Sequence, residues 1–233
     1  IHLGERDCSI QRNHQKMIEE SPSAAVSPEL REKMGHAAVT AAKAAGYVNA
    51  GTIEFLLEPD GKFWFMEMNT RIQVEHPVTE WVTGIDLVKE QLKIASGMPL
   101  EISQEDVRIQ GHAIECRINA EKPQKNFRPS PGTIQGAHFP GGNGIRVDTC
   151  VYNGCKIPPY YDSMLAKLIV HAGNRKEAIA KMQSALGEVI IDGIDTNIDY
   201  QYEILKDEDY QSGNFDTGFL ASHIIAGVKI NEN

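Results

Sequence analysis

Residues 67–76 read Glu-Met-Asn-Thr-Arg-Ile-Gln-Val-Glu-His, and this stretch decides how the chain is interpreted. Every second residue is polar: Glu67, Asn69, Arg71, Gln73 and Glu75. Side chains along an extended strand point alternately to opposite faces, so one face would carry carboxylates, amides and a guanidinium. Carboxylate and amide oxygens suit a hard cation such as Mg²⁺, and a guanidinium suits an oxyanion. The pattern predicts neighbouring cation and anion sites; the alternative is an amphipathic edge strand facing solvent.

A hairpin before this stretch supplies another carboxylate. Residues 52–57 and 63–68 are rich in strand-forming types, and Asp60-Gly61 between them is a hairpin turn signal. With these two residues at the turn, Glu54 lies opposite Glu67, and a cation between the two carboxylates would offset their repulsion. A slip of one residue would send the two groups to opposite faces, so the register stays open.

Four stretches, in order, resemble biotin carboxylase, an enzyme of the ATP-grasp superfamily and a component of acetyl-CoA carboxylase or a related biotin-dependent carboxylase. They are residues 5–9 with 14–16, residues 67–80, residues 111–121 and residues 158–164. The resemblance covers essentially the whole chain. It implies an α+β fold in which residues 1–105 are the C-terminal part of an ATP-grasp domain, an antiparallel sheet with helices. Residues 106–233 would be the biotin carboxylase C-terminal domain.

The resemblance also implies a reaction. Such ligases use MgATP to activate bicarbonate as carboxyphosphate and then carboxylate N1′ of biotin on a carrier protein. This is the first half-reaction of acetyl-CoA carboxylase in fatty acid synthesis, or of a related carboxylase. The implied cofactor is Mg²⁺ or Mn²⁺, which neutralises charge on the transferring phosphoryl group. The implied partners are a biotin carboxyl carrier protein or domain, a carboxyltransferase component and a second copy in a homodimer, with Asn143 and Arg146 at interface positions.

Each candidate site residue takes its role from the same resemblance. Glu75 would be the general base that deprotonates bicarbonate, and Arg117 would bind biotin and stabilise its enolate form. Arg71 and Lys16 complete the catalytic set. The metal ligands would be Glu54, Glu67 and Asn69; the bicarbonate site Lys16, Arg71, Gln73, Val74 and Glu75; and the nucleotide site Gln11, His14, Glu54, Leu56 and Glu67.

Three of these residues have simpler alternative interpretations. Arg117 could form a surface salt bridge with Glu115, two residues away on the same strand face. His14 and Lys16 lie in the polar run 11–16, which is also typical of a solvated loop or helix face.

Composition limits the classes of partner. The 233 residues carry a net charge of −9 without a basic run, which argues against a nucleic-acid surface. Four cysteines lack zinc-site spacing, which indicates reduced thiols. The sequence shows neither an apolar run long enough to cross a membrane nor a signal peptide, so we expect a cytoplasmic protein without a membrane partner.

Patterns along the chain predict several further elements. Helices are expected over residues 28–45, 87–96, 174–188, 198–205 and 218–226. Residues 109–119 alternate as a strand, with His112 on its apolar face as a core histidine. His76 precedes Pro77 and is expected to be extended. Trp64 and Trp81 are predicted to lie in the core.

Two competing hypotheses remain. One is another ATP-grasp ligase of the carbamoyl-phosphate synthetase type, which shares the metal-binding Glu-x-Asn. The other is a non-catalytic dimerisation or interaction module. The segment 71–76 and the Arg117 motif favour biotin carboxylase. The family's upstream domain and glycine-rich lid have no counterpart in these 233 residues, so we expect a fragment with little or no turnover by itself.

Overall fold

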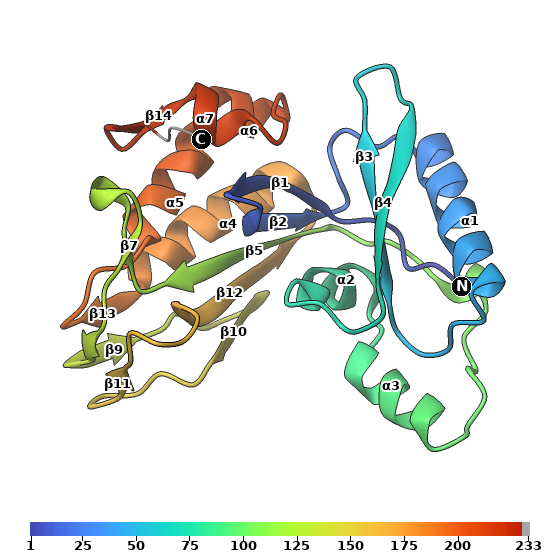
Figure 1. The fold of residues 1–233 in the computed structure, drawn as a ribbon, viewed down its shortest axis with the longest axis horizontal. Helices are drawn as coiled ribbons and strands as arrows, with labels where there is room; N and C mark the ends of the chain where they lie inside the picture. Colours follow the sequence, from blue (N-terminus) through green and yellow to red (C-terminus); the bar gives the residue numbers. More distant parts are fainter. Residues whose placement is uncertain (230–233) are drawn as a thin grey trace. The chain divides into compact units, whose positions relative to one another are not determined.

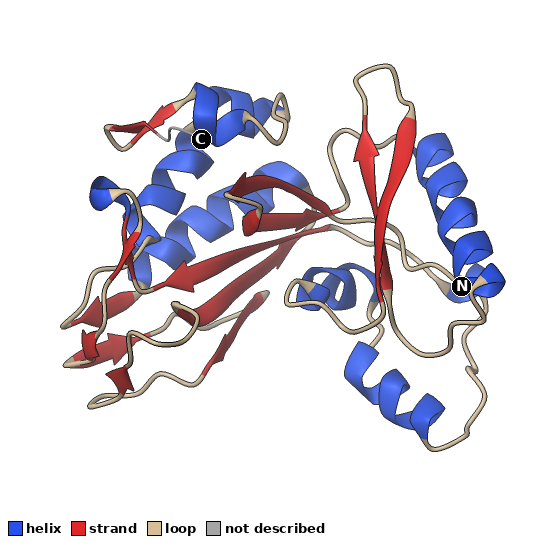
Figure 2. Cartoon of the chain, viewed as in Figure 1, coloured by secondary structure: helices blue, strands red, loops and turns tan. Residues whose placement is uncertain are grey.

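The computed structural model describes residues 1–229 and divides into two compact units. The first unit comprises Ile1–Arg6 and Ser21–Gln110, and the second comprises Asp7–Glu20 and the residues from Gly111 onward. Both combine helices with antiparallel strands, which confirms the α+β class (Figure 2). The predicted domain boundary between residues 105 and 106 remains a prediction. The compact units differ from it because β2 pairs with β5, which places Asp7–Glu20 in the second unit.

The first unit is built on a two-stranded hairpin of β3 (Thr52–Leu57) and β4 (Phe63–Asn69). Helix α1 (Pro28–Ala44) runs beside this hairpin (Figure 1). It begins at the Ser27 cap, whose side chain accepts a hydrogen bond from the Leu30 amide at 3.2 Å. The unit also contains α2 (His76–Thr83), α3 (Leu87–Ala95) and the 3₁₀ turn η1 (Gln104–Asp106). The predicted helices 28–45 and 87–96 are confirmed, whereas α2 was not predicted.

The hairpin register is confirmed at the candidate site but not at the turn. Glu54 pairs with Glu67 as predicted, but the register shifts by one residue beyond this point, so that Phe55 pairs with Phe65. The loop contains three residues instead of two: the Glu58 amide donates to the Lys62 carbonyl at 2.8 Å, and Gly61 adopts φ = +82°. Glycine adopts this left-handed conformation without steric cost. The extra residue of the bulge in β4 compensates for the longer turn and brings the two glutamates opposite each other.

The prediction of one continuous strand through residue 76 is wrong. Strand β4 ends at Asn69, and residues 70–75 form a loop that leads into α2. His76 is the first helical residue instead of an extended one. Pro77 is compatible with this because it lies in the first turn of α2, where the backbone N–H that proline lacks would have no partner within the helix. Arg71, Gln73 and Glu75 therefore do not share a strand face with Glu67 and Asn69.

The second unit contains a five-stranded sheet in the order β1-β2-β5-β12-β10. Its strands are β1 (Asp7–Arg12), β2 (Gln15–Ser21), β5 (His112–Asn119), β12 (Met164–Ala172) and β10 (Ile145–Thr149). Helices α4 (Arg175–Glu188) and α5 (Ile198–Lys206) pack against the sheet (Figure 1). The core of this unit buries apolar side chains of β5 and β12 against those of α4, including Ile114, Cys116, Leu168, Met182 and Leu186.

Short elements complete the second unit. They are β6 (Glu121–Lys122), η2 (Pro123–Lys125), β7 (Arg128–Pro129), β8 (Gly132–Thr133), β9 (Gly136–His138), β11 (Lys156–Ile157), β13 (Ile190–Asp192), α6 (Glu208–Ser212), α7 (Phe219–Ser222), β14 (Ile224–Ile225) and β15 (Val228–Lys229). The predicted helices at 174–188 and 198–205 are confirmed. The one predicted at 218–226 is wrong in extent, because α7 is followed by the β14–β15 hairpin with Gly227 at φ = +73°.

Burial tests three further predictions. His112 is confirmed as a core histidine: it is buried, and its Nε2 lies 2.6 Å from Oε2 of Glu20. Trp64 is not in the core, since it is 57% exposed on β4 and its indole donates to Glu58 at 3.0 Å. Glu115 is buried, so the surface location suggested for a salt bridge with Arg117 is wrong.

Two observations bear on the chain's surroundings. Among residues 1–229, no helix is both long and apolar enough to cross a membrane. The structure describes all four cysteines, and none of them is part of a disulfide.

His223 provides a prediction of pH-dependent stability in the second unit. Its Nε2 lies 3.0 Å from Oδ2 of Asp209, and this hydrogen bond is the main cause that raises the pKa of His223 above its ordinary value. A histidine whose pKa is raised on folding stabilises the protein below its unfolded pKa, and this contribution disappears as the pH rises through the folded pKa. We expect His223→Gln to lower the melting temperature more at about pH 5.5 than at about pH 8.5.

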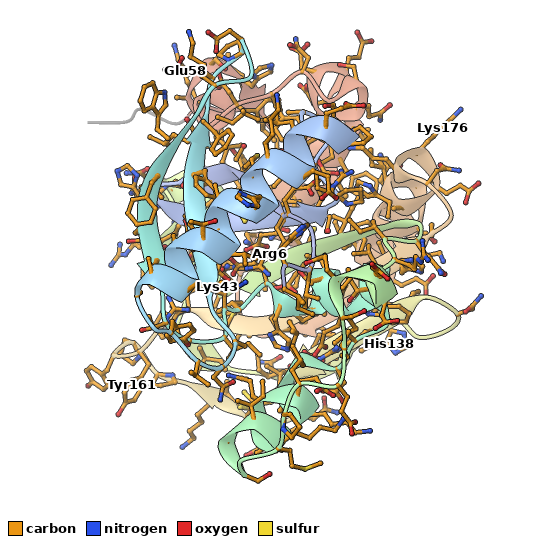
Figure 3. All side chains as sticks on the ribbon, turned by 90° about the vertical axis from the view of Figure 1, so that its right-hand side faces the viewer. Arg6, Lys43, Glu58, His138, Tyr161 and Lys176 are labelled. Carbon is orange, nitrogen blue, oxygen red and sulfur yellow. The ribbon has the colours of Figure 1, made fainter. Side chains whose placement is uncertain are left out.

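Thermal unfolding across this pH range checks the prediction, with His138→Gln as the matched control because His138 is exposed on β9 (Figure 3). A difference between wild type and His223→Gln that does not change with pH would contradict it.

Candidate active site

Three side chains of the first unit converge at the end of the β3–β4 hairpin. The Asn69 amide donates from Nδ2 to Oε1 of Glu54 at 3.1 Å and to Oε1 of Glu67 at 2.7 Å. The cross-strand pairing of the two glutamates brings their carboxylates to the same place, and Asn69 lies between them. The amide offsets part of the repulsion between the two negative groups.

This donor set fits a divalent cation. Glu54 and Glu67 offer carboxylate oxygens, and the Asn69 side chain carries an amide oxygen on the same carbon as the nitrogen that now lies between them. Rotation of the amide would present a third oxygen, and Mg²⁺ and Mn²⁺ prefer oxygen ligands. The side chains therefore meet the chemical requirement for the predicted metal site.

The loop after β4 extends this cluster. Arg71 donates to Oδ1 of Asn69 at 3.2 Å and to the Ile72 carbonyl at 3.1 Å. Gln73, which is 5% exposed, donates from Nε2 to Oε1 of Glu54 at 2.7 Å. The structure thus brings Arg71 and Gln73 to the carboxylate cluster through hydrogen bonds, although the alternating strand that predicted this is absent.

Glu75 ends the loop at the N-cap position of α2, next to the half-buried Val74, and is 2% exposed. A buried carboxylate needs compensation, and Nη2 of Arg6 lies 3.9 Å from Oε1 of Glu75. Arg6 also donates to Gln73 at 2.5 Å, to Thr52 at 3.0 Å and to Thr79 at 3.1 Å.

Sequence reasoning did not identify Arg6 as a site residue. The only signal was its place in the family-like stretch of residues 5–9, because its partners lie at least 46 positions away along the chain. Arg6 fixes the orientation of Gln73 and lies beside the Glu75 carboxylate, so the first unit holds a cation next to its candidate base.

Leu56 lies on β3 two residues after Glu54, so the two side chains point to the same face of the hairpin. Leu56 is 52% exposed. An exposed apolar side chain beside a polar cluster suits the flat face of a nucleotide base, but its nucleotide contact stays a prediction.

The second unit holds the remaining predicted residues. Strands β1 and β2 form a hairpin in which Gln11 pairs directly with Lys16. The turn between them consists of Asn13 and His14, both with positive φ (+49° and +60°), as a two-residue type I′ turn requires. The polar run 11–16 is therefore a hairpin and not a helix, and His14 lies exposed in its turn, as the solvated-loop alternative predicts.

Arg117 lies on β5, and its guanidinium pairs with the fully buried Glu19 of β2, Nε to Oε1 at 2.6 Å. Its backbone carbonyl accepts hydrogen bonds from Asn197 and Gln201. None of these three partners was predicted. All three partners lie 80 or more positions away along the chain. The only signal available for Glu19 was that it follows the family-like stretch 14–16 by three residues.

Cys116, the neighbour of Arg117 on β5, is not a candidate nucleophile. Burial is the main cause that raises the pKa of its thiol well above the ordinary value, and the Glu19 and Glu115 carboxylates raise it further. The thiol therefore stays protonated and unreactive.

Comparisons with known proteins match both parts of the chain. Residues 1–103 match the carbamoyl-phosphate synthase L chain ATP-binding domain, and residues 115–222 match the biotin carboxylase C-terminal domain. Biotin carboxylase 1 of Bacillus subtilis is 59% identical over 228 residues, which is 97% of this chain and 51% of that protein. Biotin carboxylase of Haemophilus influenzae is 54% identical over 220 residues, 94% of this chain and 49% of that protein. The chain thus spans about half the length of these curated relatives.

Solved structures show the same similarity. The biotin carboxylase domain dimer of Hydrogenobacter thermophilus 2-oxoglutarate carboxylase, in complex with MgADP, ADP and bicarbonate, superposes with a TM-score of 0.93 at 54% identity, covering 94% of this chain and 49% of that one. The biotin carboxylase component of a pyruvate carboxylase gives the same TM-score of 0.93 at 54% identity, covering 94% and 49%. The two domain matches, in this order, and the identities above 50% show that the chain belongs to the biotin carboxylase family and corresponds to its C-terminal portion.

Proposed function

We propose that the protein containing this chain is an ATP- and bicarbonate-dependent ligase that carboxylates biotin on a carrier protein by way of carboxyphosphate. The observation that carries this proposal is the hydrogen-bonded cluster of Glu54, Glu67 and Asn69, joined to Arg71 and Gln73. In this cluster, carboxylate and amide oxygens that could bind a cation lie beside the Arg71 guanidinium, which could bind an anion. Bicarbonate activation by MgATP requires both.

In the first step, bicarbonate would be bound and deprotonated. Arg71 and Gln73 have donors for its oxygens, with Val74 contributing its backbone and Lys16 a further positive charge. Glu75 would accept the bicarbonate proton, which makes the anion a better nucleophile towards the γ-phosphate. Glu54, Glu67 and Asn69 would hold Mg²⁺ or Mn²⁺, which supplies charge neutralisation at the phosphates when bound. Gln11, His14 and Leu56 would contact the nucleotide.

In the second step, Arg117 would stabilise the negative charge that appears on the ureido oxygen of biotin as N1′ loses its proton. Carboxyphosphate would break its C–O bond to give carbon dioxide and phosphate. The phosphate would take the N1′ proton, and N1′ would attack carbon dioxide to form the new N–C bond. The carboxylated biotin is passed to a carboxyltransferase component, whose acyl substrate these residues do not select. The relative from H. thermophilus, a dimer with bound MgADP and bicarbonate, supports the nucleotide, the metal, the bicarbonate and a homodimer. We propose Asn143 and Arg146 as residues of the dimer interface.

We place this reaction in the cytoplasm, within acetyl-CoA carboxylase or a related carboxylase. Relatives that belong to a pyruvate carboxylase and to a 2-oxoglutarate carboxylase leave the acyl substrate open. A carbamoyl-phosphate synthetase-type ligase is less well supported, because the biotin carboxylase C-terminal domain match covers the segment that holds Arg117.

Phosphate release from MgATP by a full-length protein that contains this chain tests the proposal. We expect release to require bicarbonate and to rise with free biotin. A rate of phosphate release that does not change when bicarbonate is added would contradict the proposal.

Glu67→Gln separates an enzyme from a non-catalytic interaction module. We expect this variant to weaken MgADP binding by more than roughly 10-fold, because it removes one charged metal ligand. Isothermal titration of residues 1–233 with MgADP measures the change. Glu58→Gln, at the exposed loop of the same hairpin (Figure 3), is the matched control and should bind like wild type. Equal affinities of Glu67→Gln and wild type would support the interaction module.

A further inference from the structure

Glu19 and Arg117 form a buried ion pair in the second unit. Glu19 lies on β2 with its side chain fully buried. Its Oε1 accepts from Nε of Arg117 at 2.6 Å and lies 2.5 Å from Nη2. The Arg117 side chain itself is 17% exposed, so a carboxylate inside the unit holds a guanidinium that reaches its surface.

The backbone of Arg117 is held from a second direction. Its carbonyl accepts from Nδ2 of Asn197 at 3.0 Å and from Nε2 of Gln201 at 2.5 Å, and both residues are fully buried at the start of α5. Asn197 also accepts from the Asn119 amide at 2.8 Å, which ties the next residues of β5 to the same point. Both ends of Arg117, the carbonyl and the Nε–Nη2 edge, are thereby fixed.

These contacts determine where the rest of the guanidinium points. The group is planar, so a carboxylate that holds the Nε–Nη2 edge also sets the direction of Nη1. A long side chain without such a partner populates many rotamers, and ordering it in the transition state would slow the reaction. A donor that is already oriented stabilises developing charge without reorganisation.

We propose that Glu19 is the positioning residue for Arg117: it holds the guanidinium in the direction needed to stabilise the enolate of biotin. This inference rests on the proposed function, in which Arg117 acts in the second step. Glu19 itself touches Arg117 and performs no chemistry on the substrate.

The neighbouring Glu20 provides the contrast. It is equally buried on β2 but points to the other face of the strand, where it pairs with Arg175 at 2.8 Å and with His112 at 2.6 Å. Arg175 lies at the start of α4 and His112 at the start of β5, and neither has a proposed role in the reaction. Glu20→Gln therefore removes a similar buried charge from a similar pair without changing Arg117.

The test compares Glu19→Gln with Glu20→Gln in a full-length protein containing this chain. We expect Glu19→Gln to lower kcat/KM for free biotin by roughly 10- to 100-fold, because a misplaced group costs about this much. Bicarbonate-dependent ATP hydrolysis without biotin should stay within about 2-fold of wild type, since Arg117 does not act in that step. Glu20→Gln should lower the melting temperature but leave kcat/KM for biotin unchanged. In an Arg117→Gln background, Glu19→Gln should have no further effect on the biotin step.

An equal loss of both reactions in Glu19→Gln, or an unchanged kcat/KM for biotin, would overturn the proposal and leave a merely structural pair. If Glu19→Gln does not fold, Glu19→Asp serves instead, because it keeps the charge but has a side chain shorter by one methylene group. This variant should also lower kcat/KM for biotin and leave bicarbonate-dependent ATP hydrolysis close to wild type. If wild type shows no biotin-dependent turnover, the proposed function fails instead.

A second measurement does not depend on turnover. The order parameter of the Arg117 Nε–H bond, from ¹⁵N relaxation of residues 1–233, should be high in wild type and in Glu20→Gln and low in Glu19→Gln. An Arg117 that is equally ordered in all three proteins would overturn the positioning role.

Discussion

Glu75→Gln is expected to abolish the activation of bicarbonate. The amide cannot accept a proton, so bicarbonate-dependent phosphate release from MgATP should fall by about 10²- to 10⁴-fold, the usual contribution of a general base. The KM for MgATP should stay close to that of wild type, because Glu75 is not among the residues proposed to hold the nucleotide or the metal. Steady-state phosphate release in the full-length protein, with and without bicarbonate, measures both quantities.

The buried position of Glu75 makes a structural control necessary. Arg6 keeps its hydrogen bonds to Gln73, Thr52 and Thr79 when the nearby carboxylate becomes an amide, so the loop should remain folded. Glu90→Gln on α3 removes a carboxylate that pairs with Lys93 of the same helix, and it should retain full activity. A Glu75→Gln protein with a wild-type melting temperature and more than half the wild-type rate would show that Glu75 is not the base.

Arg117→Gln is expected to stop biotin carboxylation while sparing the first step. Loss of one group that stabilises developing negative charge typically costs about 10²- to 10³-fold in kcat. Bicarbonate-dependent ATP hydrolysis without biotin should remain near the wild-type rate, because the guanidinium meets the substrate only after carboxyphosphate has formed. Assays with and without free biotin separate the two rates.

Arg117→Gln also leaves the buried Glu19 carboxylate without its cation, and breaking a buried pair in this way costs about 3–5 kcal/mol of folding free energy. Arg117→Lys keeps the charge but lacks the planar edge, so it should fold and still lose most of the biotin step. The double variant Glu19→Gln/Arg117→Gln removes both charges and restores stability without restoring activity. Loss of both reaction steps in a folded Arg117→Lys protein would contradict the assignment of Arg117 to the second step.

Local pattern predicted much of the first unit. The N-caps Ser27 and Asp86 and the strands around Asp60-Gly61 are decided by residues close in sequence, and the structure has them at nearly the predicted bounds. The same reasoning failed beyond Asn69. There, a sequence that alternates like a strand forms a loop, because the loop's side chains bond to Glu54 and Arg6 instead of following a strand face.

The turn of the hairpin shows how a correct result can follow from a wrong step. A two-residue turn was predicted, but the loop has three residues, and a bulge in β4 shifts the register back before Glu67. The sequence carries no signal that distinguishes these two cases, because Asp-Gly is compatible with either loop. The observed pairing of Glu54 with Glu67 therefore depends on the bulge as much as on the turn.

By itself, the sequence determined the α+β class, the family and the residue types of the proposed cation and anion sites, because motifs and strand periodicity depend on neighbouring residues. Only the tertiary structure decided which side chains support them. Arg6 beside Glu75, Glu19 beneath Arg117, and Asn197 with Gln201 at its carbonyl all come from distant positions. Buried charges and carbonyls need partners, and the fold, not the local sequence, determines which polar groups are near enough to serve.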